Sequence, residues 1–508
     1  MNKKILLSSL AGGAALLALA LKAASGRTRR PEGPALAEID AFVAGQLKRL
    51  NVPGAVLVIV ENDQITHLRG FGRARQGGEV PGPHTPFVLG SLTKSFTALA
   101  IMQLVEAGQV ELDAPVRRYL PWFRPGDAGA CITVRHLLHQ TSGLPAAAGW
   151  TPLADFDARP GATGRQAREL SALRLARPAG AAFEYCNANY NLLGLIVEAA
   201  GGQAYAGYVQ EHIFEPLKMY HSYTSQAAAR QAGLAVGHRF WFWKPCAAPG
   251  LPLPSGSLPS GQLISCAEDM GRYLCAQLNQ ARSGEGRILS AAGVAELQRG
   301  AADVAFMGVP AGQYGMGWFV TGAGQDRIVW HAGCVPDFTT YMALLPGRRQ
   351  AVALLVNAGH FMMNPVMTEL GGQVAARLAG QAPAPGKLVF TRWAPWAMRL
   401  LPLVSLFQVA AALRWVRRWR RDPQHRPHLP REILLPLLPD LLLASSLAPV
   451  LGRLGGFLQL FMPDFVCFAR VSGGFAAVWM FLRTGLALKA RRGSRPAAGK
   501  VTGGLDAS

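Results

Sequence analysis

The sequence is poor in acidic residues and in paired cysteines. Asp and Glu number 30 against 51 Lys and Arg, which leaves a net charge of +21. The seven cysteines are odd in number and contain no C-x-x-C pair, which excludes a disulfide framework and a zinc ribbon and leaves a single bridge open. The G-x-S-x-G, H-E-x-x-H, G-x-x-x-x-G-K-[ST] and G-x-G-x-x-G motifs are also absent from the sequence. We therefore expect neither a metal nor an organic cofactor.

Long apolar runs, in contrast, are plentiful. Half of the residues are hydrophobic, and the mean hydropathy of +0.17 is high for a soluble protein. From Lys387 onward, 18 Lys and Arg stand against five Asp and Glu, and they flank apolar runs. Basic residues gather in this way beside a lipid bilayer, whereas a nucleic-acid-binding domain carries them as a groove on a soluble surface. The composition predicts the membrane lipid bilayer as a partner and no nucleic acid.

Residues 1–25 are typical of a secretory signal. Two lysines precede the apolar run Ile5–Leu21, and the small residues at 23–25 follow it as a cleavage site. Lys22 lies unfavourably just before that site. A signal peptide and an uncleaved signal anchor are both left open.

Residues 34–382 have the patterns of a globular domain. Strand patterns lie near both of its ends, at residues 54–61, 64–72, 315–320, 327–330, 339–345 and 351–357. Helical patterns lie between and around them, at residues 35–50, 91–106, 134–139, 189–200 and 363–378. This order predicts an α+β domain in which both ends of the segment build one antiparallel sheet and a helical region is inserted.

Residues 393–488 form a membrane region with about three predicted transmembrane helices. The apolar stretches 393–413 and 433–452 are each long enough to cross a bilayer, and 457–488 holds at least one more span. Their proline and charge content leaves interfacial amphipathic helices as an alternative. Seven arginines lie between the first two stretches, and the tail 489–508 is also basic. Because basic flanks stay in the cytoplasm, we expect residues 34–382 outside it and the tail inside.

Ser91 and Lys94 form a candidate nucleophile and base. Ser91 opens a predicted helix, and a spacing of three residues brings the Lys94 amine back toward the serine hydroxyl. A serine needs a base to become nucleophilic, and a lysine can serve when burial lowers its pKa. Alone the S-x-x-K motif is weak, and Ser91 could equally be a helix N-cap.

Two further motifs follow along the chain. In Tyr185-Cys186-Asn187 the phenol could relay a proton, and the amide of Asn187 could orient Lys94 and hold a substrate carbonyl. His331-Ala332-Gly333 follows a predicted strand, where Gly333 lets a substrate backbone approach. The N–H of Cys334 could pair with that of Ser91 as an oxyanion hole. Taken singly, a core tyrosine, a helix-capping asparagine and a structural histidine are the favoured readings.

Together these motifs resemble the serine β-lactamase-related family, which includes class C β-lactamases, penicillin-binding proteins, D-Ala-D-Ala carboxypeptidases and esterases. Four further stretches carry the resemblance, and they are residues 132–145, 185–194, 261–270 and 314–318. The resemblance implies an antiparallel sheet sandwiched by helices, with the site between the sheet and a helical subdomain. It also implies that Ser91 is acylated, that Lys94 and Tyr185 share the proton work, and that Asn187 lines the site.

His331 and Ala332 depart from the pattern, because many β-lactamases have Lys-Thr-Gly there. A neutral imidazole attracts a substrate carboxylate less than an ammonium does, which weakens the case for β-lactam hydrolysis. We expect a membrane-anchored, extracytoplasmic serine hydrolase acting on an amide or ester, and its location favours a cell-wall peptide. A non-hydrolytic binding or scaffold protein of the cell envelope is the alternative. A third reading places the function in the membrane region as a transporter or sensor.

Overall fold

The structure is a computed structural model, which describes residues 36–125, 131–157, 159, 161–279, 282–283, 286–306, 309–381, 389–422, 428, 431, 434–452 and 454–492. The predicted signal at residues 1–25 and the basic tail from residue 493 lie outside these residues. The chain divides into two compact units, one of residues 1–396 and 460–462 and the other of residues 397–459 and 463–508. Each unit is described by itself.

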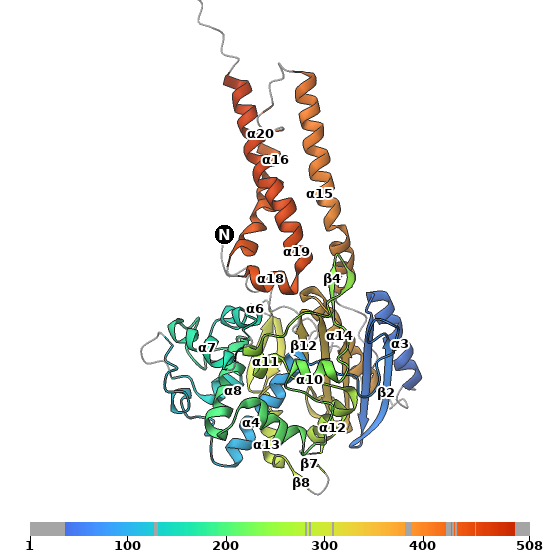
Figure 1. The fold of residues 1–508 in the computed structure, drawn as a ribbon, viewed down its shortest axis with the longest axis vertical. Coiled ribbons are helices and arrows are strands. Elements are labelled where there is room, and N and C mark those ends of the chain that lie inside the picture. Colours follow the sequence, from blue (N-terminus) through green and yellow to red (C-terminus); the bar gives the residue numbers. More distant parts are fainter. Residues whose placement is uncertain are drawn as a thin grey trace, which may run out of the picture. The chain divides into compact units, whose positions relative to one another are not determined.

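An antiparallel sheet of eight strands is the centre of the first unit (Figure 1). Its order is β2-β1-β14-β13-β12-β11-β10-β9. The strands are β1 Gly54–Glu61, β2 Gln64–Gly72, β9 Ala302–Phe306, β10 Val309–Tyr314, β11 Phe319–Thr321, β12 Ile328–Val335, β13 Phe338–Leu345 and β14 Gln350–Val356. Because β1 pairs with β14, the two ends of this unit build one sheet, as the sequence predicted.

Helices cover both faces of this sheet. Val58 pairs with Ala353, so both side chains lie on one face, and Gly271 of α12 (Ala267–Leu278) packs against Val58 there. Tyr341 pairs with Leu354 on the opposite face, where Gly371 of α14 (Asn364–Leu378) packs against the Tyr341 ring. The sheet is therefore a sandwiched layer, and strands β1 and β13 are buried almost throughout.

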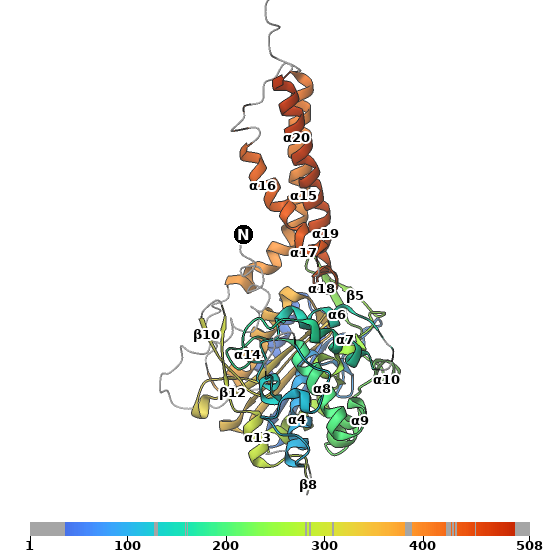
Figure 2. The ribbon, with the colours of Figure 1, turned by 90° about the vertical axis from the view of Figure 1, so that its left-hand side faces the viewer.

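The helical region is inserted between the N-terminal and C-terminal strands. Its longest helices are α4 (Thr93–Glu106) and α8 (Asn187–Gly201), which lie side by side (Figures 1 and 2). The short helices around them are α5 Val134–Leu138, α7 Ala162–Glu169, α9 Tyr205–Val209 and α11 Leu258–Gly261. Their apolar side chains share one core with the face of the sheet that carries Val58. The predicted α+β class with an inserted helical region is confirmed.

The predicted strand at residues 315–320 is wrong in its first four residues. Strand β10 ends at Tyr314 and β11 begins only at Phe319, so residues 315–318 form a turn. Gly317 has a φ of 80° in this turn. A Cβ there would lie 2.8 Å from the backbone oxygen of Lys94. The glycine is therefore needed for the turn to approach helix α4.

The second unit is built of apolar helices. Two segments that lie wholly or almost wholly in this unit, Pro395–Arg421 within α15 (Val389–Arg421) and Pro463–Lys489, are long and apolar enough to cross a membrane. A bent pair, Leu435–Leu451 with Gly455–Phe461, passes the same test together at an angle of 99°. With the bent pair counted as one span, the number is three, as predicted, and an odd number is what the predicted placement of both basic flanks on one side requires. Inside this unit, Arg483 of α20 (Gly474–Arg492) pairs with Asp440 of α16 (Leu435–Ser445) over 2.8 Å.

Candidate active site

Ser91 lies in a 3₁₀ turn, Gly90–Leu92, that leads directly into helix α4. The backbone before it is tied to two distant segments. The N–H of Leu89 donates to the carbonyl of Leu263 over 2.9 Å, and the hydroxyl of Thr340 donates to the carbonyl of Leu89 over 2.6 Å. Gly90 has a φ of 57°, which favours glycine. The serine is therefore held at the junction of the helical region and the sheet.

The amine of Lys94 is buried and faces three oxygens. Lys94 is 0% exposed. Its Nζ lies 3.0 Å from Ser91 Oγ, 2.7 Å from Asn187 Oδ1 and 2.6 Å from the backbone oxygen of Ser260. Burial lowers the pKa of Lys94 to about 7, and the neighbouring Cys186 opposes the shift. A large share of this lysine is therefore neutral at neutral pH.

These three contacts suit a neutral amine that acts as a base. A neutral amine has two N–H donors and one lone pair. The oxygens of Asn187 and Ser260 can accept both donors. The lone pair is then left for the hydroxyl of Ser91. The Lys94 amine can therefore accept the proton of Ser91 as the serine oxygen attacks a carbonyl carbon.

Tyr185 lies beside the same two residues. Lys94 Nζ is 4.9 Å from the centre of the Tyr185 ring. Burial raises the pKa of the phenol well above its ordinary value, and a hydrogen bond with the side chain of Ser91 acts in the opposite direction. The phenol is thus protonated at neutral pH and placed where it can pass a proton at Ser91. The structure brings Ser91, Lys94, Tyr185 and Asn187 together.

Strand β12 borders the site with its backbone. Strand β11 pairs with β12 only at residues 328–330, so β12 has no strand partner on that side from His331 onward in the described chain. A Cβ on Gly90 would lie 2.8 Å from the nitrogen of Cys334. A Cβ on Gly333 would lie 3.1 Å from the nitrogen of Ser91 and 2.2 Å from the carbonyl oxygen of Leu89. The two N–H groups predicted as an oxyanion hole therefore belong to tightly apposed backbone segments.

His331 is placed as a buried wall of the site, not as an open ligand. It is 1% exposed. Its Nδ1 lies 2.7 Å from the carbonyl oxygen of Ala332, so Nδ1 must carry the hydrogen. Its Nε2 then accepts from the hydroxyl of Tyr314 over 3.4 Å. Burial and the nearby Lys94 lower the pKa of His331 to about 3. The imidazole is neutral, and its polar atoms are already engaged.

Sequence reasoning missed three groups that complete the site. The carbonyl of Ser260 carries no sequence signal, because any residue supplies a backbone oxygen. Tyr190 lies with its ring 5.6 Å from Lys94 Nζ, and its position three residues after Asn187, on the same helical face, could have indicated it. Tyr314 packs at right angles to the Tyr185 ring, with centroids 6.4 Å apart. Tyr190 thus helps to bury the lysine, and Tyr314 supports the Tyr185 ring that lies beside it.

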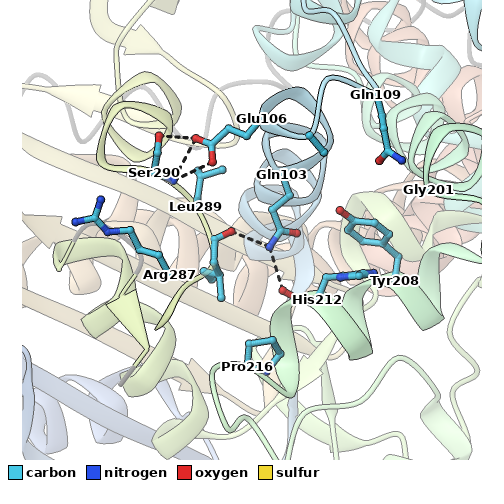
Figure 3. A pocket seen from close by; sticks show the side chains of 12 residues that line it. Gln103, Glu106, Gln109, Gly201, Tyr208, His212, Pro216, Arg287, Leu289 and Ser290 are labelled. Atoms are coloured by element: carbon cyan, nitrogen blue, oxygen red, sulfur yellow. Dashed lines mark hydrogen bonds between the residues drawn. The ribbon is translucent and has the colours of Figure 1, made fainter. Parts of the chain in front are cut away.

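A cavity of about 700 Å³ lies elsewhere, beside the last turn of α4 (Figure 3). The carboxylate of Glu106 accepts hydrogen bonds from the backbone and hydroxyl of Ser290 there. The amide of Gln103 donates to the carbonyls of His212 and Ile288 over 3.0 Å each. These contacts join chain segments, and the cavity does not include Ser91 or Lys94. Among the described residues, no group of His, Cys, Asp and Glu is placed to hold a metal ion.

The sequence profile of the Beta-lactamase family matches residues 39–376. The chain belongs to the Beta-lactamase family. The match covers well over half of the chain and includes all of the strands, helices and side chains of the site described above. The resemblance drawn from the sequence motifs is confirmed, and so is the fold class.

Curated relatives and a solved structure agree with this membership. Protein flp of Staphylococcus aureus (strain MW2) is 27% identical over 351 residues, and the chain spans 66% of its length. Penicillin-binding protein 4 of Amycolatopsis lactamdurans is 29% identical over 343 residues, which are 65% of this chain and 87% of the relative. The octameric penicillin-binding protein homologue from Pyrococcus abyssi superposes with a TM-score of 0.60 at 28% identity, covering 69% of this chain and 79% of that one.

Proposed function

We propose that this protein is a membrane-anchored, extracytoplasmic serine hydrolase that cleaves an ester or amide through an acyl-enzyme. One observation carries the proposal. The buried amine of Lys94 lies 3.0 Å from Ser91 Oγ, and its other contacts are acceptors. This arrangement leaves a lone pair for the serine proton, which is what a nucleophilic serine requires.

The reaction follows from the placed groups. Ser91 Oγ forms a bond to the substrate carbonyl carbon while its proton passes to Lys94 Nζ. The N–H groups of Ser91 and Cys334 stabilise the negative charge on the carbonyl oxygen. As the bond to the leaving group breaks, the proton passes from Lys94 to that group by way of the Tyr185 phenol. Water then attacks the carbonyl carbon of the acyl-enzyme and gives one proton to Lys94 Nζ. As the bond to Ser91 Oγ breaks, that proton passes to Ser91 Oγ, which restores the free serine and releases the acid.

The charge of the site favours an uncharged substrate portion next to β12. His331 is neutral and its nitrogens are occupied. His331 therefore offers no positive charge to a substrate carboxylate, which supports an ester or a neutral amide over a β-lactam. The apolar segments Pro395–Arg421 and Pro463–Lys489 support anchoring in a bilayer. The basic cluster at 414–431 supports an external active site.

Labelling with a fluorescent fluorophosphonate tests the proposal. We expect the full chain in membranes to be labelled, the Ser91→Ala variant to lose all label, and the Ser222→Ala variant to keep it. Ser222 is a matched control because its hydroxyl is buried and bonded to Asp269 and Ser265, outside the site. A folded wild-type chain that takes no label, or a Ser91→Ala variant that is still labelled, would refute the mechanism. The first outcome would favour a non-hydrolytic binding protein.

A further inference from the structure

Tyr185 lies between two backbone N–H groups that are held by the same buried residue, Gln140. The N–H of Glu184 donates to the backbone carbonyl of Gln140 over 2.8 Å. The N–H of Cys186 donates to its side-chain Oε1 over 3.0 Å. Gln140 itself is 0% exposed. Both residues that flank Tyr185 in the chain are therefore hydrogen-bonded to Gln140, one to its backbone carbonyl and the other to its side chain.

The same oxygen also holds the helix that carries Asn187. The Nδ2 of Asn189, in the first turn of α8, donates to Gln140 Oε1 over 2.5 Å. The hydroxyl of Ser142 donates to Asn189 Oδ1 over 2.6 Å. Gln140 thus joins the turn after α5 to the start of α8. The positions of the Tyr185 and Asn187 side chains beside Lys94 therefore depend on the hydrogen bonds of Gln140.

The backbone of Gln140 is itself in an uncommon conformation. Its φ is 60°, in the left-handed region that a non-glycine residue rarely adopts. Such a conformation persists where its surroundings fix it, and it is frequent at functional sites. The side chain of Gln140 also interacts with the hydroxyl of Tyr314, whose ring packs against that of Tyr185. The acceptor oxygen is the part of the side chain that holds Cys186 and Asn189.

We propose that Gln140 is a positioning residue that holds the Tyr185 phenol against Ser91 and Lys94. This inference rests on the proposed function, since it assigns a role within that site. A displaced phenol still leaves the serine, the lysine and the oxyanion N–H groups for binding. The loss should therefore fall on turnover, because a shift of about 1 Å can cost on the order of a hundredfold in rate.

A double-mutant cycle with Tyr185→Phe tests the proposal, with hydrolysis of p-nitrophenyl acetate by the full chain as the readout. Gln140→Met removes the acceptor at similar volume. We expect it to lower kcat by about 10- to 100-fold with KM changed by less than about threefold. In the Tyr185→Phe background, the same substitution should cost less than about threefold, because the group that it positions is gone.

Two further variants separate positioning from general destabilisation. Gln140→Glu in its neutral form keeps the acceptor oxygen, so its kcat should stay within about threefold of wild type. Gln298→Met removes another buried glutamine, bonded to Gln277 and not to the 184–189 segment, and should leave kcat unchanged.

Equal losses from Gln140→Met in both Tyr185 backgrounds would overturn the proposal. If Gln140→Met does not fold, a folded Gln140→Glu variant decides, and a loss of more than about tenfold in its kcat would also overturn it. If either of these results is found while the wild-type enzyme is still labelled at Ser91, only the role of Gln140 is refuted and the proposed function stands. A wild-type chain that is not labelled would remove both.

Discussion

Lys94 and His331 set the charge of the site at the scale of single residues. Both are buried, and burial is the main cause of the lowered pKa of each, to about 7 for Lys94 and about 3 for His331. The imidazole is therefore neutral throughout the physiological range, while the lysine changes its charge near neutrality. Of these two groups, only Lys94 can give the reaction a pH dependence near 7.

We predict that His331→Gln keeps the pH dependence of hydrolysis. The rate of p-nitrophenyl acetate cleavage should rise through about pH 7 in both proteins, because the titrating base is Lys94 in each. The absolute rate should fall less than about tenfold, since the imidazole supports the site through Tyr314. Stopped-flow assays from pH 5 to 9 measure this. Loss of the rising limb in His331→Gln would identify the imidazole as the base instead.

The residues of the site were predictable to different degrees. Spacing suggested Ser91 and Lys94, because three residues on a helix bring two side chains together, and the further motifs along the chain supported the pair. The contact of Lys94 with the Ser260 carbonyl was not predictable, since it depends on tertiary packing of an ordinary backbone group. Gln140 stood inside a stretch already singled out at residues 132–145, yet its role depends on a left-handed φ that the sequence does not display.

Strand β12 acts at the scale of the element, because its free edge brings backbone N–H groups to the nucleophile. Its neighbour β11 is short and leaves residues from His331 onward without a strand partner on that side in the described chain. Strand patterns predicted β13 and β14 closely, since their apolar runs are buried on both faces. The strand predicted at 327–330 covers only the first part of β12, which continues to Val335. The turn at 315–318 was missed because its apolar residues also fit a strand.

Gly333→Ala should damage this edge. The added Cβ would meet the carbonyl oxygen of Leu89 and the hydroxyl of Thr340, at 2.2 and 2.3 Å. We expect the free energy of unfolding to fall by at least about 2 kcal/mol and labelling of Ser91 to slow by at least about tenfold. Thermal unfolding and labelling kinetics measure the two effects.

Gly250→Ala is the matched control, because an added Cβ there has no neighbour within 4 Å. It should change neither quantity. A Gly333→Ala protein with wild-type stability and labelling would show that β12 does not press against the nucleophile turn.

At the scale of the whole molecule, the chain couples a family domain to a helical unit beyond the family match. The match ends at residue 376, and both candidate spans lie after it. Composition predicts a globular segment at residues 34–382 followed by apolar stretches, because apolar length and flanking charge can be read without tertiary structure. The bend of 99° between the helices at 435–451 and 455–461 was not predictable from apolar length, which gave a span at 433–452 and assigned residues from 457 onward to the next apolar stretch.

The charge distribution predicts which side of the membrane each part occupies. In spheroplasts of an expression host, protease added from outside should digest the domain at residues 34–382 and leave a tag after residue 508 intact. The basic residues at 414–431 should also be protected, because moving them across the bilayer is unfavourable. Lysed spheroplasts provide the control in which the tag is digested. Digestion of the tag in intact spheroplasts would contradict the predicted topology.

The rate of Ser91 phosphonylation as a function of pH tests the activation of Ser91 by neutral Lys94 most directly. The rate in the wild-type chain should rise about tenfold per pH unit below about 7 and level off above it, as Lys94 loses its proton. In Lys94→Met it should be lower by about a thousandfold or more at pH 8 and show no such limb. A wild-type profile without a limb near 7, or a limb that persists in a folded Lys94→Met protein, would contradict the account.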